Sequence, residues 1–553
     1  MFDRPIFSAP LDPEVAGDDP LGLAPTNERL YGAVFPGVNN VVRYIRVYSA
    51  ICWMIRRVDH YLKLNASSLK KREATQIFKQ ATQKIELLIA WVNKDKGYLE
   101  IAGTGRSFPV HDKPVKLVFE SFGSSGASLL AAVAYRPSLT SGLRFLEQRA
   151  DSTFSCTSAG EALADAFDAH ARKSIHYFWL ADILALEIRH REVTELESTL
   201  DVGQPSGPEQ EAFRAQFFPF PNALGFDQPT RNRWESLHLV LRAVDAICST
   251  KAVNGEPSWA TEADVRACMA RARTSNAVML QLGSLNTVQA WWAVLQLRQL
   301  QRLALDVMYC VVERWLGKQS IEGGDTDIEA CAKSIADSVV DGLSTDYRGT
   351  VLSLFEMFRE SQGDAESLYA ASCGASADEE LDVFNHIERL FGTDMEFGET
   401  GANEAITDAY IALVFCAVET SNLLGSPDAS RVLKMDQDSC SLISLLNLVL
   451  RLQHGTPSML VAYLIKHWVV LRHFHVVADR SQRDDGKNRF RFVVGDHGLE
   501  RFNPAAGMPS PAFAQDRLKH ILILCKQSGL LESDNEEGYR LAVYGKQRMA
   551  EAV

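Results

Sequence analysis

The sequence predicts a mainly α fold: a multi-helical body with a small β-hairpin near residues 98–122 and a C-terminal module that mixes helix and strand. Apolar residues recur at spacings of three and four along most of the 553 residues, as in helices with one buried face. Hydrophobic residues make up 46% and charged residues 23%, ordinary values for a globular chain long enough to bury its own core. Strict alternation is confined to short stretches. Collagen-like, rod-like and wholly disordered chains are therefore excluded.

The N-terminal region predicts an arm, two helices and a hairpin. Residues 1–28 hold five prolines among aspartates and glycines, which indicates an extended arm. Helical spacing of apolar residues covers 38–64, after a turn at Phe35-Pro36-Gly37, and a second helix spans about 67–93. The β-like stretches 98–101 and 115–119 flank a loop with Gly and Pro, so we expect them to pair.

Helices are expected again over about 126–136, 140–149, 158–172 and 174–198, and a long one includes residues 291–311. Ser158 and Glu161 have the spacing of a capping box at the start of one of them. Breaks in the pattern divide the chain into five segments. These are an arm at 1–28, a helical domain with the hairpin at 29–200, a central helical segment at 209–318, an acidic helical segment at 326–425 and a C-terminal part at 439–553.

The last 75 residues change character. Two arginines alternate with two phenylalanines over residues 489–492, and two valines follow. A Gly-Asp-His-Gly turn ends this stretch, so the pattern predicts a hairpin. An amphipathic helix over 513–527 is followed by two β-like stretches, 530–532 and 539–543, around an acidic turn. This order predicts a helix followed by a second hairpin.

Ten cysteines are spread along the chain without a CxxC pair, which argues against a structural zinc site and a disulfide framework. The N-terminus lacks the basic and apolar stretches of a secretory signal. Ten of the 24 residues in the longest uncharged window, 274–297, are Gly, Ser, Thr, Asn or Gln, too many for a membrane span. We expect a soluble, cytoplasmic bacterial protein with no membrane contact, cofactor or metal.

Charge is unevenly distributed around a net value of −13. Residues 41–96 carry 12 Lys and Arg against 4 Asp and Glu, whereas residues 321–410 carry 4 against 21. Such asymmetry indicates that different faces meet different partners, although a solvated surface explains each stretch equally simply.

Arginines and lysines in three places are candidate nucleic-acid contacts, because cations on one face can neutralise phosphates. Alternation would place Arg489 and Arg491 on one face of their strand and Phe490 and Phe492 on the other. The alternative is a half-buried hairpin with a wet face. The candidates are Arg480, Arg483, Lys487, Arg489 and Arg491 before and in the first hairpin, Arg517, Lys519 and Lys526 in the C-terminal helix, and Arg43 and Arg46 near the N-terminus.

The C-terminal order of Ser528-Gly529-Leu530-Leu531-Glu532 and Gly538-Tyr539-Arg540-Leu541 resembles the second half of a winged helix domain over about 40 residues. The resemblance implies that the preceding helix enters a DNA major groove or docks a protein. Asp534, Glu536 and Glu537 in the turn depart from the DNA-binding pattern, since they would repel phosphate.

The N-terminal run from Asp19-Pro20-Leu21-Gly22-Leu23 through Phe35-Pro36-Gly37-Val38 to Arg43-Tyr44-Ile45-Arg46-Val47-Tyr48-Ser49 is similar to the openings of uncharacterised bacterial proteins associated with phage defence. This resemblance covers about 60 residues and implies no catalytic residue.

These observations predict a non-catalytic component of a bacterial multi-protein antiviral system that binds DNA or a partner protein. One alternative is a metal-dependent nuclease or nucleotide-acting enzyme. Its site would lie near the glycine-containing loops of 103–128, or at Glu161, Asp165 and Asp168, which share a helix face. The other alternative is a pure protein scaffold.

Overall fold

The computed structural model describes residues 19–98, 101–123, 128–131, 134–149, 153–221, 226–250, 258–322, 326–343, 348–360, 399–483, 490–495, 498–502, 516–534 and 538–550. Helices make up 66% of the structure and strands 7%, which confirms the mainly α prediction. The chain forms two compact units, each built from segments far apart in sequence. The first unit comprises residues 1–31 and 263–514, and the second unit comprises 32–262 and 515–553.

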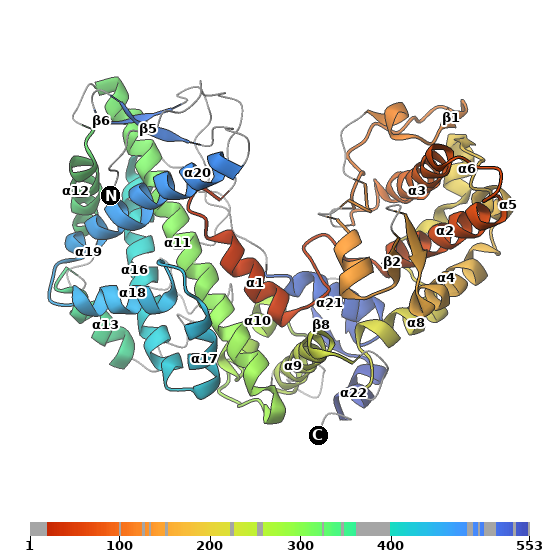
Figure 1. The fold of residues 1–553 in the computed structure, drawn as a ribbon. Coiled ribbons are helices and arrows are strands. Elements are labelled where there is room, and N and C mark those ends of the chain that lie inside the picture. The colour runs from red at the N-terminus through yellow and green to blue at the C-terminus, as the bar shows by residue number, and fades with distance from the viewer. Residues whose placement is uncertain are drawn as a thin grey trace. The chain divides into compact units, whose positions relative to one another are not determined.

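The first unit is organised around the predicted long helix, α11 (Asn286–Glu322), which packs along α16 (Glu399–Leu424) (Figure 1). Helix α16 is long and apolar enough to cross a membrane, but 78% of its apolar window is buried inside the unit, as expected of a core helix. The other described α-helices of this unit are α1 (Ala24–Val34) up to Tyr31, most of α10 (Glu262–Arg271), α12 (Ile328–Gly342), α13 (Val351–Glu360), α17 (Pro427–Met435), α18 (Leu442–Arg451), α19 (Pro457–Tyr463) and α20 (Leu471–Arg483), and the π-helix η5 (Leu464–Val470) joins the last two.

The second unit contains the two helices predicted near the N-terminus, α2 (Ile45–Leu64) and α3 (Lys71–Asn93). Its other described α-helices and strands before residue 262 are β1 (Val115–Lys116), β2 (Leu146–Gln148), β3 (Phe154–Cys156), α4 (Ser158–Ala171), α5 (Tyr177–Ala181), β4 (Glu187–Ile188), α6 (His190–Glu195), α7 (Glu197–Leu200), α8 (Gly207–Phe217) and α9 (Gln228–Thr250). Helix α2 packs on α3, α4 and α8. The turn before it uses Gly37 at φ +85°, where the backbone of Gly142 leaves no room for a side chain.

Both C-terminal hairpins are confirmed. In the first unit β5 (Phe492–Gly495) pairs antiparallel with β6 (Gly498–Arg501). In the second unit the helix α21 (Leu518–Gln527) precedes the pair β7 (Leu531–Ser533) and β8 (Tyr539–Leu541), and α22 (Val543–Ala550) follows. The backbone of Ala260 also bonds Tyr539 on β8, so a distant segment extends this hairpin.

The strand expected within 98–122 exists, but its partner differs from the prediction. Strand β1 pairs with β4, about 70 residues later, and Leu117 N donates to Leu186 O at 2.8 Å. Residues 101–106 form turns instead, in which Thr104 N bonds Ile101 O. Burial of Ile188 and Leu117 in the core explains the choice of partner.

Further expectations change for local reasons. Residues 24–28, which were expected to belong to the arm, are helical, because Asp19 Oδ1 accepts hydrogen bonds from the amides of Leu23 and Ala24 where α1 begins. Residues 1–18 lie outside the described residues. The helix expected over 174–198 is broken into α5, β4, α6 and α7. Where helices were expected over 126–136 and 140–149, the described residues 128–131 form a turn, a π-helix spans Ser138–Gly142, and β2 pairs with β3.

Candidate functional site

The candidate arginines of α2 and its approach lie inside the second unit. Arg46 has no exposed surface, and its Nη2 donates to Glu209 Oε2 at 2.8 Å while Nε lies 2.8 Å from Oε1. Arg43 is 4% exposed, and its Nη2 reaches Asn40 O. Both guanidinium groups are thus buried in contacts within this unit, and their role as nucleic-acid contacts stays a prediction.

The three carboxylates proposed as a metal site are paired with arginines of α2. Arg56 binds Glu161 and Asp165, and Asp168 accepts hydrogen bonds from Trp53, Tyr177, Arg57 and Arg172 at 2.7 to 3.1 Å. Burial opposes ionisation of Asp168, but these donors outweigh it and lower its pKa. The helix cap is Thr157, not Ser158, which leaves Glu161 to face Arg56. Within the described residues no group of His, Cys, Asp and Glu is placed to hold a metal ion.

A buried carboxylate lies next to Ser128, at the end of the glycine-containing loop of residues 123–128. Ser128 Oγ donates to Glu86 Oε1 at 2.6 Å, and Glu86 is 3% exposed. Burial raises the pKa of Glu86 to about 7, although the hydroxyl, backbone amides and Arg106 favour its ionised form. Residues 124–127 lie outside the described residues. The described donors at the end of this loop, Ser128 Oγ and the backbone amides of Leu129 and Leu130, therefore serve an internal acid that sequence analysis overlooked.

In the first unit the candidate arginines also meet internal acceptors. Arg480 donates to Asp19 O and Oδ2 at 2.7 and 2.8 Å. Arg491 lies 2.9 Å from Glu313, which is 1% exposed and also binds Arg501 at 3.0 Å. Phe492 is fully buried against His473, and Arg491, the described arginine of the predicted wet face, is engaged by Glu313. The side chain of Arg483, and all of Lys487 and Arg489, lie outside the described residues.

The candidate cations of the C-terminal helix and hairpin differ in exposure. Arg517 Nη1 donates to Val38 O at 2.6 Å, and Lys519 is half-buried. Lys526 is exposed. The turn of the hairpin is closed by Asp534, whose Oδ1 accepts from Gly538 N, and Glu536 and Glu537 lie outside the described residues. Among the candidates on α21, Lys526 is therefore the clearest one open to a ligand.

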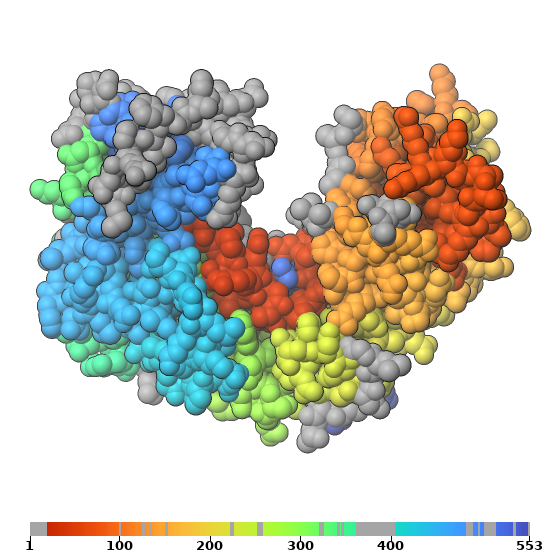
Figure 2. All heavy atoms as spheres, viewed as in Figure 1, coloured from red at the N-terminus to blue at the C-terminus, as the bar shows by residue number. Residues whose placement is uncertain are grey.

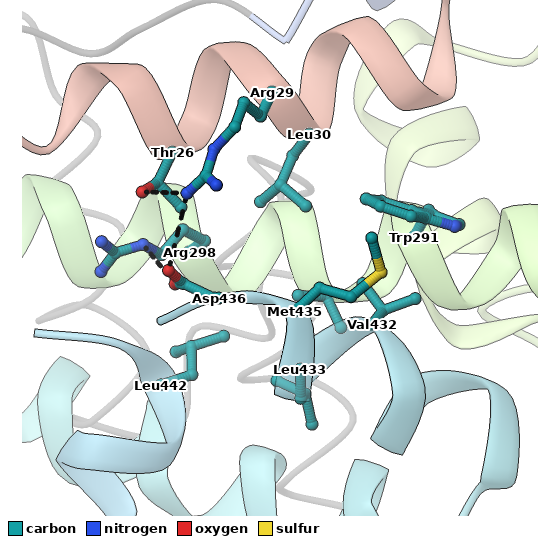
Figure 3. Close-up of a pocket in the computed structure, with 11 residues that line it drawn as sticks. Thr26, Arg29, Leu30, Trp291, Arg298, Val432, Leu433, Met435, Asp436 and Leu442 are labelled. Carbon is teal, nitrogen blue, oxygen red and sulfur yellow. Dashed lines mark hydrogen bonds and ion pairs between the residues drawn. The ribbon is translucent and has the colours of Figure 1, made fainter. Parts of the chain in front are cut away.

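A socket that sequence analysis did not predict lies in the first unit, between α1, α11, α17 and the start of α18 (Figure 3). Its cavity volume is about 90 Å³. On the face in Figure 2, atoms of α1 (red) lie beside those of α17 and α18 (cyan to blue). The lining residues are Thr26, Arg29, Leu30, Trp291, Val294, Arg298, Val432, Leu433, Met435, Asp436 and Leu442. Seven of these eleven side chains are aliphatic, aromatic or thioether, so the interior is mainly apolar.

Charged groups gather at one edge of the socket (Figure 3). Arg298 has no exposed surface; its Nε lies 3.5 Å from Asp436 Oδ2, and its Nη1 donates to Cys440 O at 2.6 Å. Burial lowers the pKa of this guanidinium, and Asp436 opposes that effect. Arg29 reaches the other oxygen of Asp436 at 3.9 Å and has a side chain that is 66% exposed. One carboxylate thus faces two guanidinium groups, one fixed and one at the surface.

The rim combines exposed apolar and charged surface. Met435 is 55% exposed, although its neighbour Leu433 is 2% exposed and forms the interior. Arg29 is held by one hydrogen bond, from Nη2 to Thr26 Oγ1 at 3.2 Å, and by the long contact to Asp436. An apolar hollow with a polar rim has the chemistry of a binding site.

No known protein family, curated protein or solved structure matches this chain.

Proposed function

We propose that this chain is a protein-binding, non-catalytic component of a bacterial multi-protein defence system. The observation that carries the proposal is the apolar socket of the first unit, with Arg29 and Met435 exposed at its rim. Partner proteins bind mainly through a few anchoring side chains that fill such hollows, surrounded by polar groups that exclude water. The defence setting rests on the resemblance of the N-terminal run to phage-defence-associated proteins.

The distribution of arginines favours a protein over a nucleic acid as partner. Phosphate binding requires exposed cations, because its free energy comes largely from counterions released by neutralised phosphates. Arg46, Arg480 and Arg491 are instead engaged by Glu209, Asp19 and Glu313. Arg548, which was not a candidate, is also engaged internally, because its Nη2 donates to Phe218 O and Pro219 O. Most described candidates thus serve the fold.

Co-purification at low salt from the native cells tests the proposal, with and without nuclease treatment. We expect one stoichiometric protein partner that survives the nuclease. A complex that dissolves when nucleic acid is digested would contradict the proposal. So would duplex binding with a log–log salt slope near −5, the value for about six neutralised phosphates.

The enzymatic alternative has its own test. Divalent-metal-dependent cleavage of nucleic acids or nucleotides, lost on Asp165→Asn, would replace the proposed function. We expect no such activity, because Asp165 is engaged by Arg56 and is 75% exposed.

A further inference from the structure

We propose, on the basis of the proposed function, that the socket receives one leucine- or methionine-sized side chain of the partner protein, and that a carboxylate beside this side chain in the partner pairs with Arg29. The occupant is thus a surface segment in which an apolar residue adjoins an acidic one. Three features of the socket lead to this chemistry: its volume, its lining and its charge.

The volume limits the occupant to a single side chain. A cavity of about 150 Å³ lined by apolar side chains holds benzene. The socket, at about 90 Å³, is smaller, so it suits an aliphatic or thioether side chain better than a ring. Leu30, Val432 and Leu433 offer it a branched aliphatic surface, and Trp291 a flat one. Such an occupant gains contact on several sides while its backbone stays at the rim.

The charges select an acidic neighbour for that side chain. At the charged edge two guanidinium groups share the carboxylate of Asp436, so the lining carries a surplus of one positive charge. An incoming carboxylate neutralises this surplus, whereas an incoming cation would compete with both arginines for Asp436. Arg29 is the group that responds, because it is 66% exposed while Arg298 is buried and bonded to Cys440 O. Arginine also offers two parallel donors that match a carboxylate.

Trp291 provides a direct readout. The full-length chain is labelled with 5-fluorotryptophan, and the fluorine resonance of Trp291 is assigned by its absence in Trp291→Phe. The probe is acetyl-Leu-Asp-amide. We expect a saturable shift of this resonance at millimolar probe concentration. Acetyl-Leu-Asn-amide should bind about tenfold more weakly, because it lacks the charge-assisted hydrogen bond to Arg29. Acetyl-Gly-Asp-amide should produce no shift.

A charge exchange identifies the arginine. In Arg29→Glu the preference should reverse, so that acetyl-Leu-Lys-amide binds more tightly than acetyl-Leu-Asp-amide. The matched control is Arg431→Glu on α17, since Arg431 is 62% exposed and is also paired with an aspartate, Asp428, at 3.2 Å. This control should leave all probe affinities unchanged. Both substitutions change exposed side chains, so the fold is retained.

Several outcomes would overturn the inference: equal affinity for the Asp and Asn probes, no reversal in Arg29→Glu, or no shift of the Trp291 resonance by any probe. Tighter binding of N-acetylleucine than of the dipeptide would also overturn it, by indicating a site for a small carboxylate. The proposed function fails separately, if no stoichiometric protein partner co-purifies. A partner that co-purifies equally with the wild type and Arg29→Glu leaves the proposed function standing and removes the socket from it.

Discussion

Arg46 and Glu209 form an ion pair in which neither side chain has any exposed surface. Ser206 N also donates to Glu209 Oε2, and Arg46 Nη2 donates to Gln204 O, so the pair joins α2 to the start of α8. A buried charge is tolerated when both partners are present and fully hydrogen-bonded, and it becomes costly when one partner is lost. The pair therefore identifies the structural role of a residue whose sequence context predicted a phosphate contact.

The Glu209→Ala variant should lower the free energy of unfolding by about 3–5 kcal/mol, because it leaves the Arg46 charge buried without its partner. Urea unfolding followed by far-UV circular dichroism measures the loss. The double variant Arg46→Met, Glu209→Leu should be closer to the wild type than Glu209→Ala, since it removes both charges. A loss below 1 kcal/mol for Glu209→Ala would show that the pair is solvated in solution.

The Arg491→Glu variant should destabilise the first unit, by about 3 kcal/mol, because it places a second carboxylate beside the buried Glu313. Thermal unfolding of the variant measures the effect. If this variant lost a binding activity, the loss would therefore reflect unfolding of the first unit and would not show that Arg491 contacts a ligand. Lys526→Glu on exposed α21 surface is the informative control, with an expected change within about 0.5 kcal/mol. If Arg491→Glu left the stability unchanged, Arg491 would not be needed to neutralise Glu313 and could contact a phosphate.

Asp306 should make stability fall as pH rises. Burial raises its pKa to about 7, although Arg302 lies 3.5 Å away and favours ionisation; Asp19 opposes it. The folded chain therefore binds more protons than the unfolded chain between about pH 4 and 7. The contribution is full below the unfolded pKa and is lost as pH passes through 7.

The Asp306→Asn variant should remove this dependence and gain about 1–3 kcal/mol over the wild type at pH 8, with little difference at pH 4. Chemical unfolding at a series of pH values provides the measurement, with the exposed Asp337→Asn as control. A wild type whose stability shows no difference from Asp306→Asn at any pH would contradict the burial argument.

Asp168 should change the stability with pH in the opposite direction to Asp306, because its pKa is shifted the other way. Its pKa is lowered, so the stability it contributes is present above the unfolded pKa near 4 and is lost as pH falls through its lower folded value. The Asp168→Asn variant should be less stable than the wild type at pH 7, and this difference should shrink under strongly acidic conditions. Asp165→Asn, at a carboxylate that is 75% exposed, should show a smaller difference at both pH values. Identical acid unfolding of the wild type and Asp168→Asn would refute this prediction.

Sequence patterns predicted what is determined locally. Helical spacing located α2, α3 and α11, and the glycine turns located both C-terminal hairpins, because these elements depend on neighbours within a few residues. The partner of β1 was not predictable in this way, since Ile188 is brought to it by the fold. The charge counts showed which segments are basic, but they could not show the role of the arginines, namely which groups they contact.

That role depends on long-range pairing. Arg46 and Glu209 are 163 residues apart, and Arg480 and Asp19 are 461 apart, so no local motif links them. The socket has the same origin, because Leu30, Trp291 and Leu433 come from helices separated by more than a hundred residues. The sequence offered only a weak indication that Arg29 lies at a binding site. An arginine next to an apolar residue, here Leu30, is typical of any amphipathic helix surface.

The most direct test of the account is the stoichiometry of the complex recovered from native cells with wild type, Arg29→Glu and Arg431→Glu, each after nuclease treatment. We predict one protein partner at fixed stoichiometry with the wild type and Arg431→Glu, and at least tenfold less of it with Arg29→Glu. Recovery of the chain alone after nuclease treatment would contradict the claim that this chain acts by binding a protein.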